Sequence, residues 1–242
     1  MKEILELTYH IFDLDDTLIN TRFAYFLSQR KALEEIYPDS DQDDLIIKIN
    51  RLKKLTAHFS SAFPKEYFKA FLIQESFAKN EIEKKTERLL RIYEKVFWEN
   101  LTVFEGVFKY LDLLAKQKKQ LFIISNGNFE NQMKKMRLTK LNSYFPKKNV
   151  YVSSRFKPDQ KKPSPFIILK LMEIQTVNPS QAIYYGNSVS DIISGNLAGI
   201  KTLFMGDKKL LKNSVEKLEQ PDYKLSSWKN RKIQRFEKTF DR

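Results

Sequence analysis

Hydrophobic residues in the second half of the chain follow two alternating patterns. Short apolar runs predict buried β-strands at 121–124, 150–152, 182–185, 202–205 and 223–225. Between them, apolar residues recur at helical spacing and predict helices over 105–119, 129–137, 164–174, 190–198 and 208–218. Alternating strands and helices indicate a parallel sheet covered on both faces, and the apolar run at 9–12 most simply joins that sheet. The pattern predicts an α/β fold with a doubly wound parallel sheet.

Residues 20–100 show the helical pattern alone. Four amphipathic faces predict helices with these buried residues: Phe23, Phe26, Leu27 and Leu33; Leu45, Ile49, Leu52 and Leu55; Tyr67, Phe68, Phe71 and Leu72; Leu89, Ile92, Tyr93, Val96 and Phe97. We therefore expect an all-helical domain at 21–99, inserted into a core formed by 1–20 and 100–242. An insertion directly after the first strand would sit over the strand ends, where doubly wound sheets bind ligands.

Composition narrows the class of protein. The chain has 242 residues, of which 42% are hydrophobic, and no apolar stretch approaches the roughly 20 residues of a membrane span. The absence of cysteine excludes disulfides and thiolate metal sites. The first residues carry no cleavage signature, so we expect a cytoplasmic protein with no membrane partner.

The net charge of +13 comes mainly from residues 100–242, which hold 27 basic and 12 acidic side chains. Such a surface could attract nucleic acid or phosphorylated substrates, or it could be a solvated exterior without a partner. The basic residues are not interleaved with aromatic ones in a nucleic-acid-binding motif, so a nucleic-acid partner is not favoured. The sequence does not indicate an oligomeric state.

The end of the first predicted strand carries two carboxylates. Asp13 and Asp15 are two positions apart, so an extended strand end aims both into one cavity, and Thr17 closes the turn that follows. Two acids this close repel each other, and they become useful when a cation holds one ionised while the other exchanges a proton. The alternative interpretation is a solvated acidic turn.

Three further polar features also fall at predicted strand ends. Ser125-Asn126-Gly127 offers a hydroxyl and backbone N–H groups to an oxyanion where a helix starts. Lys162 precedes a helix that opens with prolines. A cation at the N-terminal end of a helix is unfavourable unless an anion lies nearby, so this position indicates an anion close to Lys162. The segment from Gly186 to Asp191 places the amide of Asn187 and a carboxylate around another strand-to-helix turn.

With these four features in this order, nearly the whole chain resembles the haloacid dehalogenase superfamily. The first motif matches at Asp13 and Asp15, the second at Ser125, the third at Lys162 and the fourth from Gly186 to Asp191. Members similar to phosphoglycolate phosphatases and nucleotidases carry a helical cap between the first two motifs. The chain departs from the usual Gly-Asp-x-x-x-Asp of the fourth motif, because Asn187 replaces the first acid.

The resemblance implies phosphoryl transfer with Mg²⁺ as cofactor. Asp13 would attack phosphorus and Asp15 would act as general acid and base. Ser125 and the N–H of Asn126 would bind a phosphoryl oxygen, and Lys162 would offset the developing charge. The metal ligands would come from the Asp13 carboxylate, the Asp15 carbonyl oxygen and the side chain of Asn187, with Asp191 supplying further negative charge to the metal site.

These residues predict a Mg²⁺-dependent phosphomonoester hydrolase that acts on a small phosphorylated metabolite such as a sugar phosphate, phosphoglycolate or a nucleoside monophosphate. A phosphatase of nucleic-acid ends and a catalytically weak binding protein on the same fold remain alternatives. Arg22, Phe26 and Arg30 are spaced four residues apart. They could share a face toward the cleft, or Phe26 could lie in the helical core with both arginines in solvent.

Overall fold

Seven strands form one sheet within the part of the chain that the computed structural model describes, which is residues 2–59, 64–206, 217–229 and 234–235. The sheet order is β3-β2-β1-β4-β5-β6-β7. The strands are β1 (Tyr9–Phe12), β2 (Gln120–Ser125), β3 (Val150–Val152), β4 (Ala182–Gly186), β5 (Lys201–Met205), β6 (Tyr223–Leu225) and β7 (Gln234–Arg235). All pairs are parallel except β6 with β7.

The strand order makes β1 the centre of the sheet. Phe12 is in register with Ile123 of β2 on one side and with Tyr185 of β4 on the other. The chain leaves β1 toward β2 and β3 and returns to β4, so the direction of winding reverses between β1 and β4. A crevice opens at the carboxyl ends of the strands at such a switch point, and ligands of doubly wound sheets bind there.

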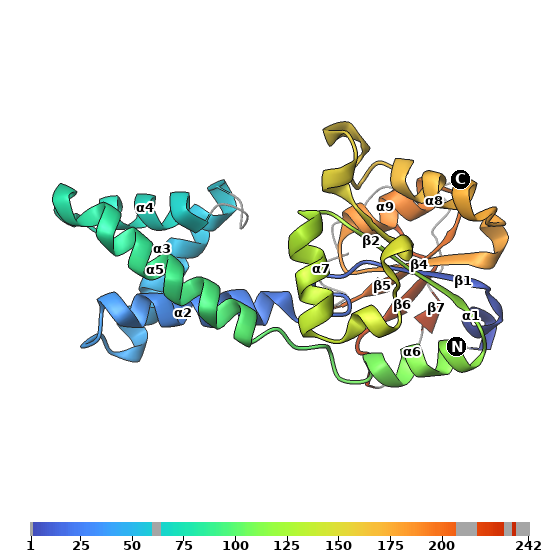
Figure 1. Cartoon of the computed structure of the whole chain (residues 1–242), viewed down its shortest axis with the longest axis horizontal. Coiled ribbons are helices and arrows are strands. Elements are labelled where there is room, and N and C mark those ends of the chain that lie inside the picture. The colour runs from blue at the N-terminus through green and yellow to red at the C-terminus, as the bar shows by residue number, and fades with distance from the viewer. Residues whose placement is uncertain (1, 60–63, 207–216, 230–233, 236–242) are drawn as a thin grey trace. The chain divides into compact units, whose positions relative to one another are not determined.

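Helices cover both faces of this sheet (Figure 1). In this part of the chain they are α1 (Lys2–Glu6), α6 (Val107–Lys116), α7 (Phe129–Leu138), α8 (Phe166–Gln175) and α9 (Val189–Leu197). Alternation along the strands sends Ile11 and Tyr184 into a core with Ile168 of α8, whereas Tyr185 packs with Tyr110 of α6. The predicted doubly wound α/β class is therefore confirmed.

The chain divides into two compact units, one formed by Met1–Asn20 with Thr102–Arg242 and the other by Thr21–Leu101. The second unit contains α2 (Thr21–Ile36), α3 (Gln42–Phe59), α4 (Pro64–Gln74) and α5 (Lys79–Glu99). Its core is mostly the predicted one: Leu45, Ile49, Leu52, Tyr67, Phe68, Phe71, Leu72, Leu89 and Tyr93 are buried together. The helical unit therefore has a hydrophobic core of its own.

The predicted buried face of α2 is partly wrong. Phe23 is 49% exposed and Phe26 is 36% exposed. The buried positions of α2 include Ala24, Ser28 and Ala32, which recur every four residues. α2 and α5 lie close together, and small side chains at buried positions are compatible with a close approach of two helices. The ammonium group of a lysine on α3, Lys53, lies over the Phe26 ring at 5.3 Å.

Two expectations concern the remaining segments. The helix predicted over 208–218 lies outside the described residues up to 216, and 217–219 forms a short 3₁₀ helix. Among the helices that the structure describes, none combines the length and the apolar composition needed to cross a lipid bilayer.

Candidate active site

The loop after β1 places Asp13 at the centre of the sheet edge. The Asp13 N–H donates to the carbonyl of Tyr185 at 2.8 Å, which continues the β1–β4 pairing one residue beyond the strand. The loop then turns back on itself, and the Thr17 hydroxyl donates to Asp13 Oδ2 at 3.1 Å. The Thr17 carbonyl accepts a hydrogen bond from the indole of Trp228 at 2.7 Å. These bonds fix the direction of the Asp13 carboxylate.

Lys162 lies buried between two carboxylates. Its Nζ is 2.7 Å from Asp13 Oδ1 and 2.6 Å from Asp191 Oδ1, and it donates to the Tyr184 hydroxyl at 2.9 Å. The Tyr184 hydroxyl donates in turn to the carbonyl of Ile124 at the end of β2. Residues from four separate segments therefore meet around one ammonium group, as the sequence predicts for strand ends on one edge.

Burial dominates the electrostatics of this cluster. It raises the pKa of the Asp13 carboxyl to about 7, against the opposing effect of Lys162, and the Asp191 carboxylate raises it further. Burial would lower the pKa of Lys162, but the carboxylates of Asp13 and Asp191 together raise it well above its ordinary value. Lys162 is thus held as a permanent buried cation, which suits a site that receives an anion.

The second predicted motif lies beside this cluster. Ser125 ends β2 and is buried, and its hydroxyl oxygen accepts a hydrogen bond from Gln132 Nε2 at 2.8 Å. The Asn126 side chain bonds the backbone of Lys162 in both directions, donating to its carbonyl and accepting from its N–H, each at 3.1 Å. Asn126 therefore ties the second motif to the third.

Asp15 faces α7. Its Oδ2 accepts from Gln132 Nε2 and its Oδ1 from Lys135 Nζ, both at 2.7 Å. These two α7 residues and Tyr184 are site residues that the sequence reasoning missed. The three-residue spacing of Gln132 and Lys135 carries no distinctive signal, because polar residues at this spacing occur on many helix faces. The apolar run that contains Tyr184 predicts a buried strand, and that pattern does not place the Tyr184 hydroxyl.

The fourth motif is held together by Asp191. Its Oδ2 accepts from the N–H groups of Asn187 and Ser188, at 3.1 and 3.0 Å. The same oxygen accepts from the hydroxyl of Ser188 at 2.6 Å, and Ser188 is the N-cap residue of α9. Its Oδ1 is held by Lys162. A side chain at Gly186 would place a Cβ 2.3 Å from the Asp191 Cβ, so the turn requires glycine.

This geometry changes the expectation for Asp191. Both of its oxygens already accept hydrogen bonds from donors of the chain, and the residue is 1% exposed. In this structure Asp191 anchors Lys162 and the turn that carries Asn187, and its contribution of negative charge to the metal site stays a prediction.

The remaining oxygen donors fit a Mg²⁺ ion. Asp13 Oδ2 and Asn187 Oδ1 lie 3.1 and 3.3 Å from the Thr17 hydroxyl, which can donate to either, so the two oxygens lie near each other, while Lys162 contacts the other Asp13 oxygen. A carboxylate and an amide oxygen are hard ligands suited to an ion that keeps several waters. No group of three or more His, Cys, Asp or Glu side chains that could hold a metal occurs in the described ranges.

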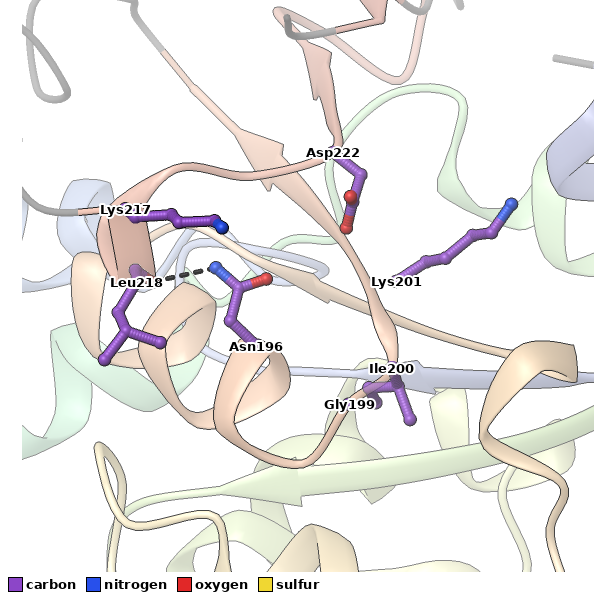
Figure 2. A pocket seen from close by; sticks show the side chains of 7 residues that line it. All are labelled: Asn196, Gly199, Ile200, Lys201, Lys217, Leu218 and Asp222. Carbon is purple, nitrogen blue, oxygen red and sulfur yellow. Dashed lines mark hydrogen bonds between the residues drawn. The ribbon is translucent and has the colours of Figure 1, made fainter. Parts of the chain in front are cut away.

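A pocket of about 330 Å³ lies away from this cluster (Figure 2). It is lined by Asn196, Gly199, Ile200, Lys201, Lys217, Leu218 and Asp222. Lys201 begins β5 and Asp222 directly precedes β6, so the pocket lies at the amino ends of these strands, opposite the edge that carries Asp13. Asn196 donates to the carbonyls of Leu218 and Gln220, and Asp222 accepts from the N–H of Thr202. These polar groups hold the backbone, and we do not place the reaction there.

The chain is similar to several known proteins. A family model described as haloacid dehalogenase-like hydrolase matches residues 10–205. The chain is 28% identical over 213 residues to glyceraldehyde 3-phosphate phosphatase of Pyrococcus furiosus, covering 88% of this chain and 86% of that protein. It is 28% identical over 201 residues to phosphoglycolate phosphatase of Aquifex aeolicus, covering 79% and 81%.

A solved structure shares the fold. It is that of the candidate hydrolase YfnB of Bacillus subtilis, described as bound to magnesium and as revealing interdomain movement. The TM-score is 0.67 with 21% identity, over 92% of this chain and 95% of that one.

Proposed function

This chain belongs to the haloacid dehalogenase-like hydrolases, and from that membership we propose that it hydrolyses small phosphate monoesters with Mg²⁺ as cofactor and Asp13 as nucleophile. The observation that carries the proposal is the buried Lys162 ammonium, held between Asp13 and Asp191 at the switch point of the sheet. A fixed cation beside an acidic nucleophile is the arrangement that phosphoryl transfer needs, since negative charge develops on the phosphoryl oxygens.

In the first step an Asp13 carboxylate oxygen attacks phosphorus. The bond between phosphorus and the ester oxygen breaks, and the electron pair leaves with that oxygen, which takes a proton from the Asp15 carboxyl group. Asp13 now carries the phosphoryl group as an acyl-phosphate. Ser125 and the N–H of Asn126 would hold a phosphoryl oxygen, while Lys162 offsets the charge on another.

In the second step the acyl-phosphate is hydrolysed. A water oxygen attacks phosphorus and gives a proton to the Asp15 carboxylate. The bond from phosphorus to the Asp13 oxygen breaks, so phosphate leaves and both carboxyl groups return to their starting state. Asp15 thus acts once as acid and once as base, which requires its carboxyl group to stay beside the reacting oxygens.

The proposed Mg²⁺ ligands are the Asp13 carboxylate, the Asp15 carbonyl oxygen and the Asn187 amide oxygen. When bound, the ion would draw negative charge from the phosphoryl oxygens and orient them. Support comes from the convergence of the Asp13 and Asn187 oxygens at Thr17. The magnesium in the YfnB structure is consistent with this proposal.

The substrate class is a small phosphorylated metabolite in the cytoplasm. Two of the relatives are named for phosphoglycolate and for glyceraldehyde 3-phosphate, which are both small phosphate esters. The helical unit Thr21–Leu101 follows the catalytic loop directly, and we propose that it acts as a cap that selects the leaving group. The basic second half does not by itself favour nucleic-acid ends.

A panel of phosphate esters assayed with and without Mg²⁺ tests the proposal. We expect phosphate release from phenyl phosphate and from at least one small metabolite ester, dependent on Mg²⁺ and absent in Asp13→Asn. Release from a 5′-phosphorylated oligonucleotide in preference to metabolites would favour the nucleic-acid alternative. No release from any ester at saturating Mg²⁺ would overturn the proposal in favour of a binding protein.

A further inference from the structure

Two side chains of α7 hold the carboxylate of Asp15. Lys135 Nζ contacts Oδ1 and Gln132 Nε2 contacts Oδ2, each at 2.7 Å. One helix therefore holds both oxygens of this carboxylate. Gln132 Nε2 also donates to the Ser125 hydroxyl at 2.8 Å, so a single amide nitrogen links Asp15 to the proposed phosphate-binding residue.

The orientation of the Gln132 amide is defined by its surroundings. The side chain is 2% exposed, and its Oε1 is buried without a hydrogen-bond partner in the described structure. Rotating the amide would turn Oε1 toward the Asp15 carboxylate, where two acceptors would repel each other. The chain thus leaves one buried oxygen unpaired in order to keep the donor on Asp15 and Ser125. Gly127 provides the room, because a Cβ there would lie 3.2 Å from Gln132 Nε2.

Lys135 is also buried and contacts Asp15. It is 6% exposed, although lysine ammonium groups rarely leave water without an anionic contact. Its ammonium lies against Asp15, whose side chain is 28% exposed. The Asp15 carboxylate is therefore held by a buried cation and is itself only partly buried.

The helix that carries both residues is anchored at its first turn. Asn128 caps α7 with its side chain. Ser153 accepts from the N–H of Gly127 and Ser154 accepts from the N–H of Phe129, both at 2.9 Å. The loop after β2 is thereby fixed to the segment after β3. Gln132 and Lys135 project from a helix whose start cannot shift without breaking these bonds.

We propose that Gln132 and Lys135 are positioning residues that hold the Asp15 carboxyl group where it protonates the leaving oxygen. The inference rests on the proposed function, because it assigns a purpose to the arrangement around the general acid. It has a consequence that a purely structural contact would lack. The loss of either residue should lower kcat/KM most for substrates whose leaving group needs a proton, and least for substrates whose leaving group departs without one.

Two aryl phosphates of similar shape separate these cases. Phenolate is a poor leaving group and needs a proton, whereas 2,4-dinitrophenolate leaves without one. For Lys135→Met we expect kcat/KM to fall by about 10- to 100-fold on phenyl phosphate and by less than about 3-fold on 2,4-dinitrophenyl phosphate. Arg137→Met is the matched control, since Arg137 is an exposed cation on the same helix, and it should change neither value.

Gln132→Leu provides a second test that removes no charge, and it decides the matter if Lys135→Met does not fold. It should show the same selective loss on phenyl phosphate. Combined with Asp15→Asn, each variant should add less than about 2-fold to the loss, because the group that it positions is already gone.

Equal losses on both esters, or full additivity with Asp15→Asn, would overturn the inference. Activity of the wild-type protein distinguishes a failure of the proposed function from a failure of the positioning role. If it hydrolyses neither ester, the proposed function has failed. If the wild-type protein hydrolyses both esters and the variants lose no more activity on phenyl phosphate than on 2,4-dinitrophenyl phosphate, only the positioning role has failed.

Discussion

The buried histidine of β1 gives a pH dependence of stability whose size follows from the structure. His10 is fully buried, with Nδ1 2.7 Å from the Tyr185 hydroxyl and Nε2 3.2 Å from the carbonyl of Leu7. Because a carbonyl only accepts, Nε2 carries the proton and Nδ1 accepts from Tyr185. Protonating Nδ1 would place a positive charge in the core, away from water, and would require the Tyr185 hydroxyl to turn its proton toward the Tyr110 hydroxyl, 2.7 Å away.

Burial, aided by the charge of Lys119, lowers the pKa of His10 from 6.5 to about 4, against the opposing hydrogen bond to Leu7. Since the folded-state pKa lies below the unfolded one, the unfolded chain binds a proton first as pH falls. The contribution of the neutral His10 to the free energy of unfolding is therefore fully present above about pH 6.5 and is lost as pH falls toward 4. At 1.36 kcal/mol per unit, the loss is about 2 kcal/mol at pH 5 and about 3 kcal/mol below pH 4.

Urea unfolding at pH 7 and pH 5 measures this loss. His10→Gln removes the titrating group, so the difference in unfolding free energy between the two pH values should shrink by about 2 kcal/mol relative to wild type. His58→Gln is the matched control, because His58 is exposed on α3, and it should keep the wild-type difference. If His10→Gln loses as much stability on acidification as wild type, the assignment of a buried neutral imidazole is wrong.

Three further predictions concern the site and the helical unit. Asn187→Asp adds a negative charge whose attraction for Mg²⁺ is worth about 4 kcal/mol before hydration offsets part of it, so activity should saturate at an Mg²⁺ concentration at least about tenfold lower than in wild type. An unchanged metal titration would show that Asn187 does not face the ion. Gly186→Ala forces a Cβ to within 2.3 Å of Asp191 and should lower kcat by about 100-fold or more through displaced Lys162; wild-type kcat would contradict this. Phe26→Ala removes a partly exposed ring and should change the ranking of phosphate esters more than the rate on phenyl phosphate; equal losses on every ester would assign Phe26 a structural role only.

The sheet was predictable because buried parallel strands leave a simple pattern. Runs that are apolar on both faces stand out between helical stretches, and the predicted strands at 9–12, 150–152 and 223–225 agree with the structure to the residue. The two-residue strand β7 carries no such run and was missed. Parallel strands end at one edge, so the meeting of the segments after β1, β2 and β4 followed from the topology, whereas Lys162 reaches Asp13 from a loop ten residues beyond β3.

The parts that the sequence did not reveal depend on helix orientation. Rotation about the axis of α7 decides whether Gln132 and Lys135 reach Asp15, and a charged helix face gives no sign of that rotation. In α2 the buried positions include small residues, so the prediction that Phe23 is buried is wrong, and of the two alternatives for Phe26 its exposure does not favour the one in the helical core. The donors to the Asp191 carboxylate, a backbone turn and Lys162, likewise become visible only in three dimensions, and the contribution of Asp191 to the metal site stays a prediction.

The most direct test of the central claim is to trap the reaction intermediate. Wild-type protein turning over phenyl phosphate with Mg²⁺ is quenched with borohydride, which reduces an acyl-phosphate to the alcohol and leaves free carboxylates intact. Peptide mass spectrometry then locates the reduced residue. We expect reduction at Asp13, dependent on substrate and absent in Asp13→Asn. Reduction at another residue, or undiminished turnover by Asp13→Asn, would contradict it.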